Sequence, residues 1–144
     1  RDSAEATDFL AQLPETEFIV QEYIEPAFGY LTRIEIVEKE AALVVTRSVA
    51  TNGLSSYHEG STYKMYPTCP PGVIAMSEEA AHILDIWFGS FDIIESVSGP
   101  KIIDANSVSN VSEDCTEIFD YDLMAAHAQG IAHMLRQAGS AIRN

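Results

Sequence analysis

The chain has 144 residues, 47% of them hydrophobic, which is enough for one domain, spanning residues 1–144, with a core of its own. Its 22 acidic and 8 basic residues give a formal net charge of −14, which argues against nucleic acid or an anionic membrane surface as a partner. No run approaches the roughly 20 apolar residues of a membrane span, and the chain begins without a signal-peptide pattern, so we expect a cytoplasmic protein.

The first half of the sequence predicts a short helix followed by strands. Residues 2–13 begin with a capping pattern, are rich in Ala, and end before a proline, as a short helix does. Three runs of β-branched and other apolar residues predict strands: Phe18–Ile24, Leu31–Val37 and Ala41–Thr46. Because a polar turn separates the last two runs, we expect residues 31–47 to form a hairpin.

The middle of the sequence predicts a long loop and then a helix. Residues 48–72 contain Asn52-Gly53, Gly60-Ser61 and three prolines, a composition typical of loops, and a loop of this length is usually functional or mobile. Ser77, followed by two glutamates, is predicted to cap a helix. The apolar residues of this helix recur at helical spacing: Ala80, Ile83, Leu84 and Trp87.

The last third predicts a second hairpin and a closing helix. Phe91–Ser96 and Lys101–Ala105 flank a turn at residues 97–100, and the closing helix begins at about Tyr121. The apolar positions of the closing helix are Met124, Ala128, Ile131 and Leu135. The predicted fold class is therefore α+β, an antiparallel sheet of hairpins with helices packed on one face.

The two cysteines, Cys69 and Cys115, lie far apart in the sequence and have no CxxC or Cys/His ligand spacing. Neither a disulfide framework nor a zinc site is indicated. Reduced thiols agree with the expected cytoplasmic location.

Polar residues in the second hairpin form a candidate metal site. Asp104 and Asn106 are two apart on a strand, so their side chains share one face. If the hairpin turns about Ser98 and Gly99, Asp92 lies directly opposite Asn106. Oxygen ligands of this kind suit Mg²⁺ or Mn²⁺. The alternative is that Asp104 and Asn106 only end a strand and start a turn.

The order of several short pieces points to a family. The pieces are Gln21-Glu22-Tyr23-Ile24, Arg33 in the following strand, Arg47 ending the next, a glycine-containing loop, Phe91-Asp92-Ile93-Ile94 and Asp104-Ala105-Asn106. In order and spacing this series resembles the ATP-grasp superfamily, especially members that ligate amino acids or peptides. The resemblance covers roughly Phe18 to Leu135 and implies the fold of the C-terminal, catalytic half. It also implies an enzyme that uses ATP and Mg²⁺ (or Mn²⁺) to join a carboxylate to an amine or similar nucleophile through an acylphosphate.

The resemblance assigns a role to three groups of residues. The strand that lines the adenine pocket corresponds to Gln21, Glu22, Tyr23 and Ile24, with Glu25 as a candidate for the ribose hydroxyls. Arg33 and Arg47 correspond to arginines that face the phosphates and the acylphosphate, a role that suits the forked guanidinium. The metal ligands correspond to Asp92, Asp104 and Asn106.

The chain departs from the family pattern in two ways. The family commonly has Glu at the position of Asp104, which bears on the number of metals. Its phosphate-binding lysines and glycine-rich lid lie upstream of the adenine strand, whereas the lysines of this chain, Lys39, Lys64 and Lys101, all lie downstream. We therefore expect the lid and the N-terminal domain to be absent, the remaining N-terminal half of the ligase to be a partner, and this chain to be inactive alone.

Other interpretations remain open at this stage. The chain could be a non-catalytic ATP-grasp-like binding or regulatory module, or a small acidic interaction domain without a nucleotide site. Glu22 could be one solvated acid among many, and Arg33 could pair with Glu35 or Glu22 at the surface. Asn52, His58 and Ser61 are weaker candidates for phosphate or substrate contacts. The three helical histidines, His82, His127 and His133, have no metal-ligand spacing and suit surface or packing positions.

Overall fold

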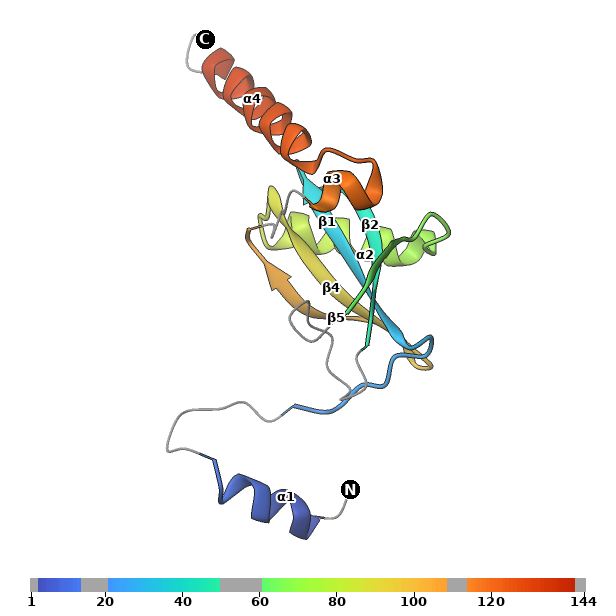
Figure 1. Ribbon diagram of the computed structural model, residues 1–144. Coiled ribbons are helices and arrows are strands. Elements are labelled where there is room, and N and C mark those ends of the chain that lie inside the picture. Colours follow the sequence, from blue (N-terminus) through green and yellow to red (C-terminus); the bar gives the residue numbers. More distant parts are fainter. Residues whose placement is uncertain (1–2, 14–20, 50–60, 109–113, 142–144) are drawn as a thin grey trace.

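The computed structural model describes residues 3–13, 21–49, 61–108 and 114–141 (Figure 1). In chain order its elements are α1 (Ser3–Leu10), β1 (Tyr30–Val37), β2 (Glu40–Ser48), β3 (Tyr63–Met65), α2 (Pro71–Ile83), β4 (Phe88–Ser96), β5 (Gly99–Asn106), α3 (Asp114–Phe119) and α4 (Leu123–Ala141). The described strands form a five-stranded antiparallel sheet in the order β3-β2-β1-β4-β5. The predicted α+β class, with an antiparallel sheet of hairpins, is confirmed.

Both predicted hairpins are present. Between β1 and β2 the turn consists of Glu38 and Lys39, whose φ angles of 56° and 70° are both positive. Turns of this handedness match the twist of the strands that they join. The turn between β4 and β5 consists of Val97 and Ser98, since Ser96 pairs with Gly99.

The register of the second hairpin differs from the prediction. Asp92 lies opposite Asp104, and Asn106 lies opposite Ser90. The hairpin turns earlier than the sequence suggested, and the pairing shifts between Asp92 and Ile93, which leaves Ile103 as an extra residue on β5. The predicted pairing of Asp92 with Asn106 is therefore wrong, because neither the turn position nor a bulge can be read from alternation.

The helix α2 begins seven residues earlier than predicted, since its N-cap is Pro70 and not Ser77. Pro71 occupies its first turn, where a proline costs no hydrogen bond and its fixed φ suits a helix. Ser77, the predicted cap, is fully buried in the middle of the helix and donates from Oγ to the carbonyl oxygen of Ile74 at 2.7 Å. Of the predicted apolar face, Ala80 packs against the core, whereas Ile83 and Leu84 are 75% and 55% exposed. The buried residues of α2 are Val73, Ser77 and Ala81.

Two further predictions need correction. Residues 21–26 have no strand structure, so the strand predicted at 18–24 is wrong over its described part, while residues 18–20 lie outside the described residues. The loop predicted at 48–72 contains β3, which pairs with β2, and the start of α2. A strand of three residues is too short to give a periodic pattern.

The closing helix α4 is confirmed, but its predicted buried face is not. Leu135 is 63% exposed, and Met124 and Ile131 are exposed as well, whereas Leu123 and Gly130 are buried. The helix runs beyond the end of the sheet (Figure 1), so an apolar face at helical spacing does not lie against the core. Among the helices in the described part of the chain, none has the length and hydropathy to cross a membrane.

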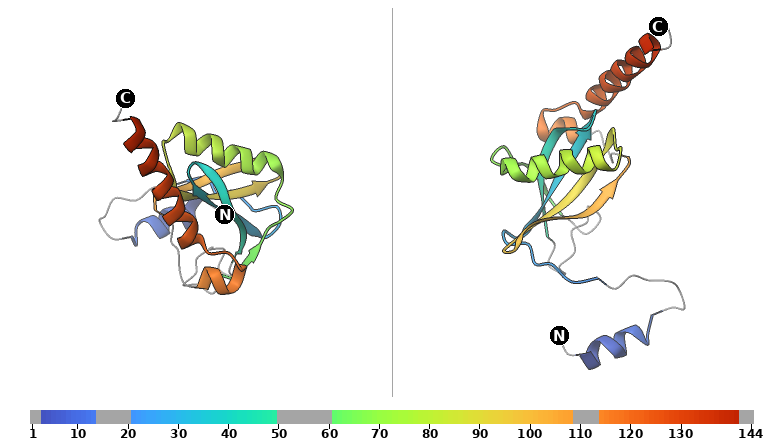
Figure 2. Two further views of the ribbon diagram at one scale, coloured as in Figure 1. Left: turned by 90° about the horizontal axis from the view of Figure 1, so that it is seen from above. Right: turned by 180° about the vertical axis from the view of Figure 1, so that it is seen from behind.

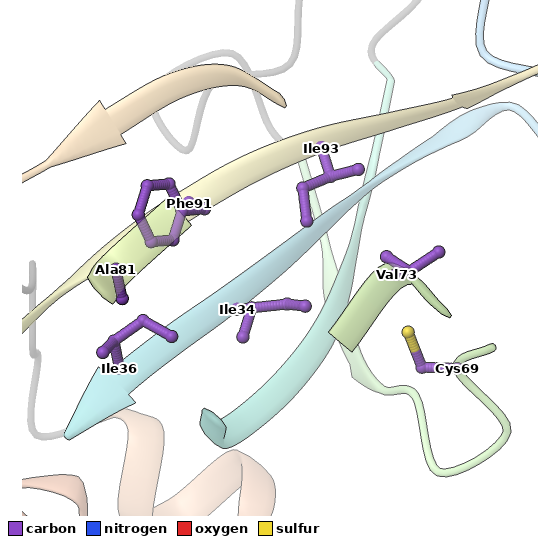
Figure 3. Packing of buried hydrophobic residues seen from close by; sticks show 7 residues of the cluster. All are labelled: Ile34, Ile36, Cys69, Val73, Ala81, Phe91 and Ile93. Atoms are coloured by element: carbon purple, nitrogen blue, oxygen red, sulfur yellow. The ribbon is translucent and has the colours of Figure 1, made fainter. Parts of the chain in front are cut away.

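The main core lies between α2 and one face of the sheet. Ile34 and Ile36 of β1 and Phe91 and Ile93 of β4 are fully buried there (Figure 3). They pack with Val73 and Ala81 of α2 and with Cys69. Figure 2 shows α2 lying along this face. On the other face, a smaller cluster joins Leu43 and Val45 of β2 to Leu123 at the start of α4.

Candidate functional site

The strands that carry the main core also carry charges on their opposite face. Because side chains alternate along a strand, Arg33 and Glu35 point away from Ile34 and α2. Cross-strand pairing places Asp92 beside Arg33 and Ser90 beside Glu35, on the same face. This face is turned toward the viewer in Figure 1, with α2 behind the sheet. We refer to Arg33, Glu35, Arg47 and Asp92 as the charged cluster.

Arg33 is held by three side-chain hydrogen bonds. Its Nε donates to Oε1 of Glu35 at 2.7 Å, its Nη1 to Oδ1 of Asp92 at 3.1 Å, and its Nη2 to Oγ of Ser90 at 2.7 Å. Arg33 is only 6% exposed. Burial acts to lower the pKa of its guanidinium, but the carboxylates of Glu35 and Asp92 outweigh that effect and raise it. The guanidinium is therefore a fixed positive charge.

Asp92 connects the two arginines. Its Oδ1 accepts from Arg33, and its Oδ2 accepts from Nη2 of Arg47 at 2.9 Å, while the residue is 5% exposed. The charged cluster holds two positive and two negative side chains, and buried charges are tolerated when they are paired in this way. Three residues that the sequence singled out, Arg33, Arg47 and Asp92, are thus in direct contact. The pair between Arg33 and Glu35 that we considered also exists, although it is buried and not at the surface.

Asp104 and Asn106 extend this face onto the edge strand β5. Asp104 lies opposite Asp92, and Nδ2 of Asn106 donates to Oδ2 of Asp104 at 2.9 Å. The two residues share a face, as their spacing predicts, and Asp104 is exposed. Beside the buried charged cluster, Asp104 therefore presents a carboxylate to solvent on β5.

The donor set suits a hard divalent cation. Two carboxylates and an amide oxygen are what Mg²⁺ or Mn²⁺ takes from a protein when water and phosphate complete its shell. Within the described residues, no group of three or more His, Cys, Asp and Glu side chains could hold a metal ion. A cation on this face would therefore depend on Asp92, Asp104 and Asn106 together with ligands from outside these residues.

The residues predicted to line the adenine pocket do not belong to the charged cluster. Gln21, Glu22, Tyr23 and Glu25 are exposed and Ile24 is half-buried, in a segment without regular structure. Their nucleotide-binding role stays a prediction.

The weaker candidates are scattered. Ser61 is buried, whereas Asn52 and His58 lie outside the described residues. His82 is exposed at the end of α2, the ring of His127 packs edge-on against Phe88, and His133 contacts Glu38. These contacts agree with surface and packing positions for the three histidines.

Two residues of this face were not predicted as members of the site: Ser90 was not considered, and Glu35 was considered only as a surface partner of Arg33. Each lies two positions from a residue that was singled out, Glu35 from Arg33 and Ser90 from Asp92. Alternation along β1 and β4 places each pair on one face. That rule could have found both residues had it been applied beyond the second hairpin.

Comparison with known proteins gives one related sequence and several related folds. No family model matches the sequence. A curated relative from Desulfotalea psychrophila, described as a probable alpha-L-glutamate ligase, is 27% identical over 89 residues, which are 62% of this chain and 19% of the relative.

Two solved proteins share the fold at low sequence identity. The ATP-grasp ligase PsnB in complex with a minimal precursor has a TM-score of 0.57 at 11% identity, over 81% of this chain and 37% of PsnB. A second PsnB structure, with a phosphomimetic precursor variant, Mg and ADP, has a TM-score of 0.55 at 11% identity, over 80% and 34% of the two chains. The macrocyclase MdnC from Microcystis aeruginosa MRC, bound to the precursor peptide MdnA, has a TM-score of 0.50 at 15% identity, over 76% and 34%.

Proposed function

Since the chain has the fold of the C-terminal half of an ATP-grasp ligase, as its sequence predicts, we propose that it is the catalytic part of an ATP-dependent ligase. The proposed reaction joins a carboxylate to an amine or a similar nucleophile through an acylphosphate. The observation that supports this most directly is the contact of Arg33 and Arg47 with Asp92 beside Asp104. The chain spans 19% of the curated relative and 34–37% of the solved proteins, so the activity proposed is that of a larger assembly.

In this reaction the protein positions groups and offsets charge. A carboxylate oxygen of the substrate attacks the γ-phosphorus of ATP, the bond to the bridging oxygen breaks, and ADP leaves. The nucleophile then attacks the acyl carbon and displaces inorganic phosphate. Neither step requires a covalent bond to the protein. Charge stabilisation by fixed cations is therefore the main contribution expected from the side chains.

The two arginines have different roles in this proposal. Arg33 is fixed by three acceptors and buried, which favours a positioning role: it holds Asp92 in place. Arg47 is the second-to-last residue of β2, at the edge of the charged cluster, which favours contact with a phosphate group of the substrate. A guanidinium binds phosphate oxygens through two parallel hydrogen bonds.

The oxygen ligands on β4 and β5 would hold Mg²⁺ or Mn²⁺. Asp92, Asp104 and Asn106 are the residues proposed for this role, and a bound ion would neutralise charge on phosphate oxygens. The presence of Mg and ADP with PsnB supports the proposal for this chain. Whether one or two ions bind depends in part on the short side chain of Asp104.

The remaining contacts are proposed by resemblance. Residues 21–25 would approach the adenine and ribose, and the remaining N-terminal half of the ligase would supply the lysines and the lid that cover the phosphates. The precursor peptides bound by PsnB and MdnC suggest an amino-acid or peptide carboxylate as the substrate. A cytoplasmic location is proposed with this activity, since ATP is available there and Cys69 is a free thiol.

The test is ATP-dependent acylphosphate formation by the longest form of the protein. Hydroxylamine traps an acylphosphate as a hydroxamate, so ADP and hydroxamate should form together when a panel of amino acids and peptides is supplied. Asp104→Asn should lower the rate at least about tenfold, because a charged ligand is lost. Glu79→Gln removes an exposed acid from α2, behind the sheet, and should leave the rate unchanged.

The outcomes separate the interpretations. Nucleotide binding without ADP or hydroxamate formation would favour the non-catalytic module, and no binding at all would contradict a nucleotide site. The 144-residue chain alone should not turn over and should bind MgATP only in the millimolar range, because several charge-assisted hydrogen bonds, each contributing roughly 1.5 to 3 kcal/mol, come from the other half.

A further inference from the structure

Gly89 lies beside the end of the edge strand β5. It is the second residue of β4 and is buried. The next residue, Ser90, pairs with Asn106, the last residue of β5. A methyl group at Gly89 would overlap the backbone carbonyl oxygen of Asn106 and would lie 3.2 Å from its carbonyl carbon and 2.9 Å from Cγ2 of Ile86. The missing side chain at Gly89 therefore leaves room for the backbone of Asn106.

A side chain at position 89 would displace Asn106 more readily than β4. Gly89 pairs with Ile36 of β1, which is fully buried in the main core. Within the described residues β5 pairs with β4 alone, and Asn106 is its last residue. The end of an edge strand has fewer contacts to lose than a strand inside the sheet. The overlap is therefore relieved by movement of Asn106.

The position of Asn106 matters because its side chain belongs to the proposed metal site. Its Nδ2 donates to Oδ2 of Asp104 at 2.9 Å, on the charged face of the sheet. Alternation along β4 places Gly89 on the other face, together with Phe91 and α2. Gly89 therefore acts on the backbone of Asn106 from the face opposite to the ligands.

From this arrangement we infer that Gly89 is a positioning residue for the proposed metal site. Its lack of a side chain allows Asn106 to take its position beside Asp104. The groups of a binding site must be held within about 0.5 Å of their productive geometry, and the overlap of a methyl group with the carbonyl oxygen requires a larger shift. This inference rests on the proposed metal-binding role of Asp104 and Asn106.

The test is a titration of the longest form of the protein with Mn²⁺, followed by the relaxation of water protons, which detects weak binding. Gly89→Ala should bind Mn²⁺ at least about tenfold more weakly than the wild type, the loss usual when a group that orients a metal ligand is changed. Gly72→Ala is the matched control, because a methyl group there meets no atom of the described residues within 4 Å. It should leave the affinity unchanged.

A second control separates positioning from general loss of stability. Val73→Ala removes apolar volume from the core under α2. It should lower the free energy of unfolding and leave the affinity for Mn²⁺ unchanged. An equal loss of affinity in Val73→Ala and Gly89→Ala would overturn the inference, because any weakening of the sheet would then have the same effect.

Asp104→Asn separates failure of this inference from failure of the proposed function. If Asp104→Asn loses Mn²⁺ binding but Gly89→Ala binds as the wild type does, Gly89 does not position the ligands and the metal site stands. If the wild type and Asp104→Asn bind Mn²⁺ equally, the proposed site itself is wrong, and this inference fails with it.

The hydrogen bond between Asn106 and Asp104 gives a second measurement that needs no metal. In the NMR spectrum of Gly89→Ala the side-chain amide signals of Asn106 should shift, because Nδ2 moves away from Oδ2 of Asp104. The guanidinium signals of Arg33, which is held by β1 and β4, should be unchanged. Unchanged signals of Asn106 in a folded Gly89→Ala would overturn the inference.

A double variant keeps the inference testable if Gly89→Ala does not fold. Adding Ile86→Ala removes the contact of the new methyl group with the Ile86 side chain and keeps its overlap with the backbone of Asn106. The double variant should fold and should still bind Mn²⁺ weakly. If it does not fold either, the inference is overturned, because Gly89 would then support the sheet as a whole and not the end of β5.

Discussion

The two faces of the central strands are both buried, but by different chemistry. On β1, every residue from Leu31 to Ile36 is buried. On the side of α2 the strand contributes Ile34 and Ile36 to a close-packed apolar cluster. On the other side it contributes Arg33 and Glu35 to the charged cluster, which ion pairs hold together. One face supplies stability through apolar burial, and the other holds charges in fixed positions, as a binding site requires.

The separation of the faces is not complete, since Leu43 and Val45 are buried on the charged face. Glu95 is buried on the α2 side, where its Oε1 accepts from Oγ1 of Thr32 at 2.7 Å. It lies toward the end of the main core, close enough to Cys69 and Tyr66 to affect their ionisation. Each of these buried polar groups has a partner, and within the described residues no buried side-chain nitrogen or oxygen is left without one. The apolar face therefore accepts polar groups only when they are paired.

Removing apolar volume should have the largest effect on stability. Phe91 is fully buried among Ile34, Ile36 and Ala81. Phe91→Ala should lower the free energy of unfolding by about 4 kcal/mol through lost burial and the cavity left behind. Ile83→Ala, at an exposed position of α2, should cost less than about 0.5 kcal/mol. Chemical denaturation measures both, and equal costs would mean that α2 does not pack as described.

Removing one charge from the opposite face should lower stability slightly less. Unlike the loss of apolar volume, this loss should be partly recovered when the paired charge is removed as well. Arg33→Met leaves Glu35 and Asp92 buried with one arginine between them and should cost about 3 kcal/mol. Arg33→Met combined with Glu35→Leu removes a matched pair and should recover part of that loss. A double-mutant cycle measures the coupling between the two residues. If the single and double variants lost the same stability, the cluster would not depend on charge balance.

Cys69 should be less reactive than an ordinary thiol. Burial raises its pKa to about 11, and the carboxylate of Glu95 contributes to the shift. Since the thiolate is the reactive form, alkylation of Cys69 in a Cys115→Ser variant should be slow at pH 8 and increase up to about pH 11. Ionisation is easier in the unfolded chain, so stability should fall as pH rises from about 9 to 11. Rapid alkylation at pH 8 would show that the thiol is not buried under α2.

The smallest effect concerns the start of α2. If Ser77 capped the helix, as its sequence context predicts, Ser77→Ala would cost about 1 kcal/mol. In the structure Ser77 lies in mid-helix and donates to the carbonyl of Ile74. Removing the hydroxyl should therefore change stability by less than about 0.5 kcal/mol, since the backbone hydrogen bond of the helix to this carbonyl is kept. Thermal unfolding of the variant distinguishes a capping Ser77 from a mid-helix Ser77. A loss of about 1 kcal/mol would support the capping position that the sequence predicts.

The two hairpins could be predicted because they depend on local signals. Alternation in residues 31–37 and a polar turn identify β1 and β2 without any tertiary information. The start of α2 could not be predicted, because Pro71 and Gly72 look like loop residues, and the serine and two glutamates after them look like a cap. The spacing of apolar residues in α4 predicts a helix. The sequence does not show that this helix extends past the end of the sheet, where its apolar face has no core to pack against.

The candidate site was predicted in its residue types but not in its contacts. The spacing of Asp104 and Asn106 is enough to predict that they share a face. The pairing of Asp92 with Asp104 depends on a bulge at Ile103, which no local sequence pattern predicts. Arg47 on β2 contacts Asp92 on β4 across the intervening strand β1. This contact therefore depends on the order of the strands in the sheet. The sequence carries this information only through resemblance to a family.

A structure of the protein with Mn²⁺ and ADP tests the central claim most directly, since anomalous scattering locates the metal. We expect a manganese peak within bonding distance of Asp92, Asp104 and Asn106. We also expect phosphate oxygens near the ion and Arg33 still bonded to Glu35. Saturated nucleotide with its metal elsewhere, or no peak on this face of the sheet, would contradict the assignment of the charged face as the catalytic one.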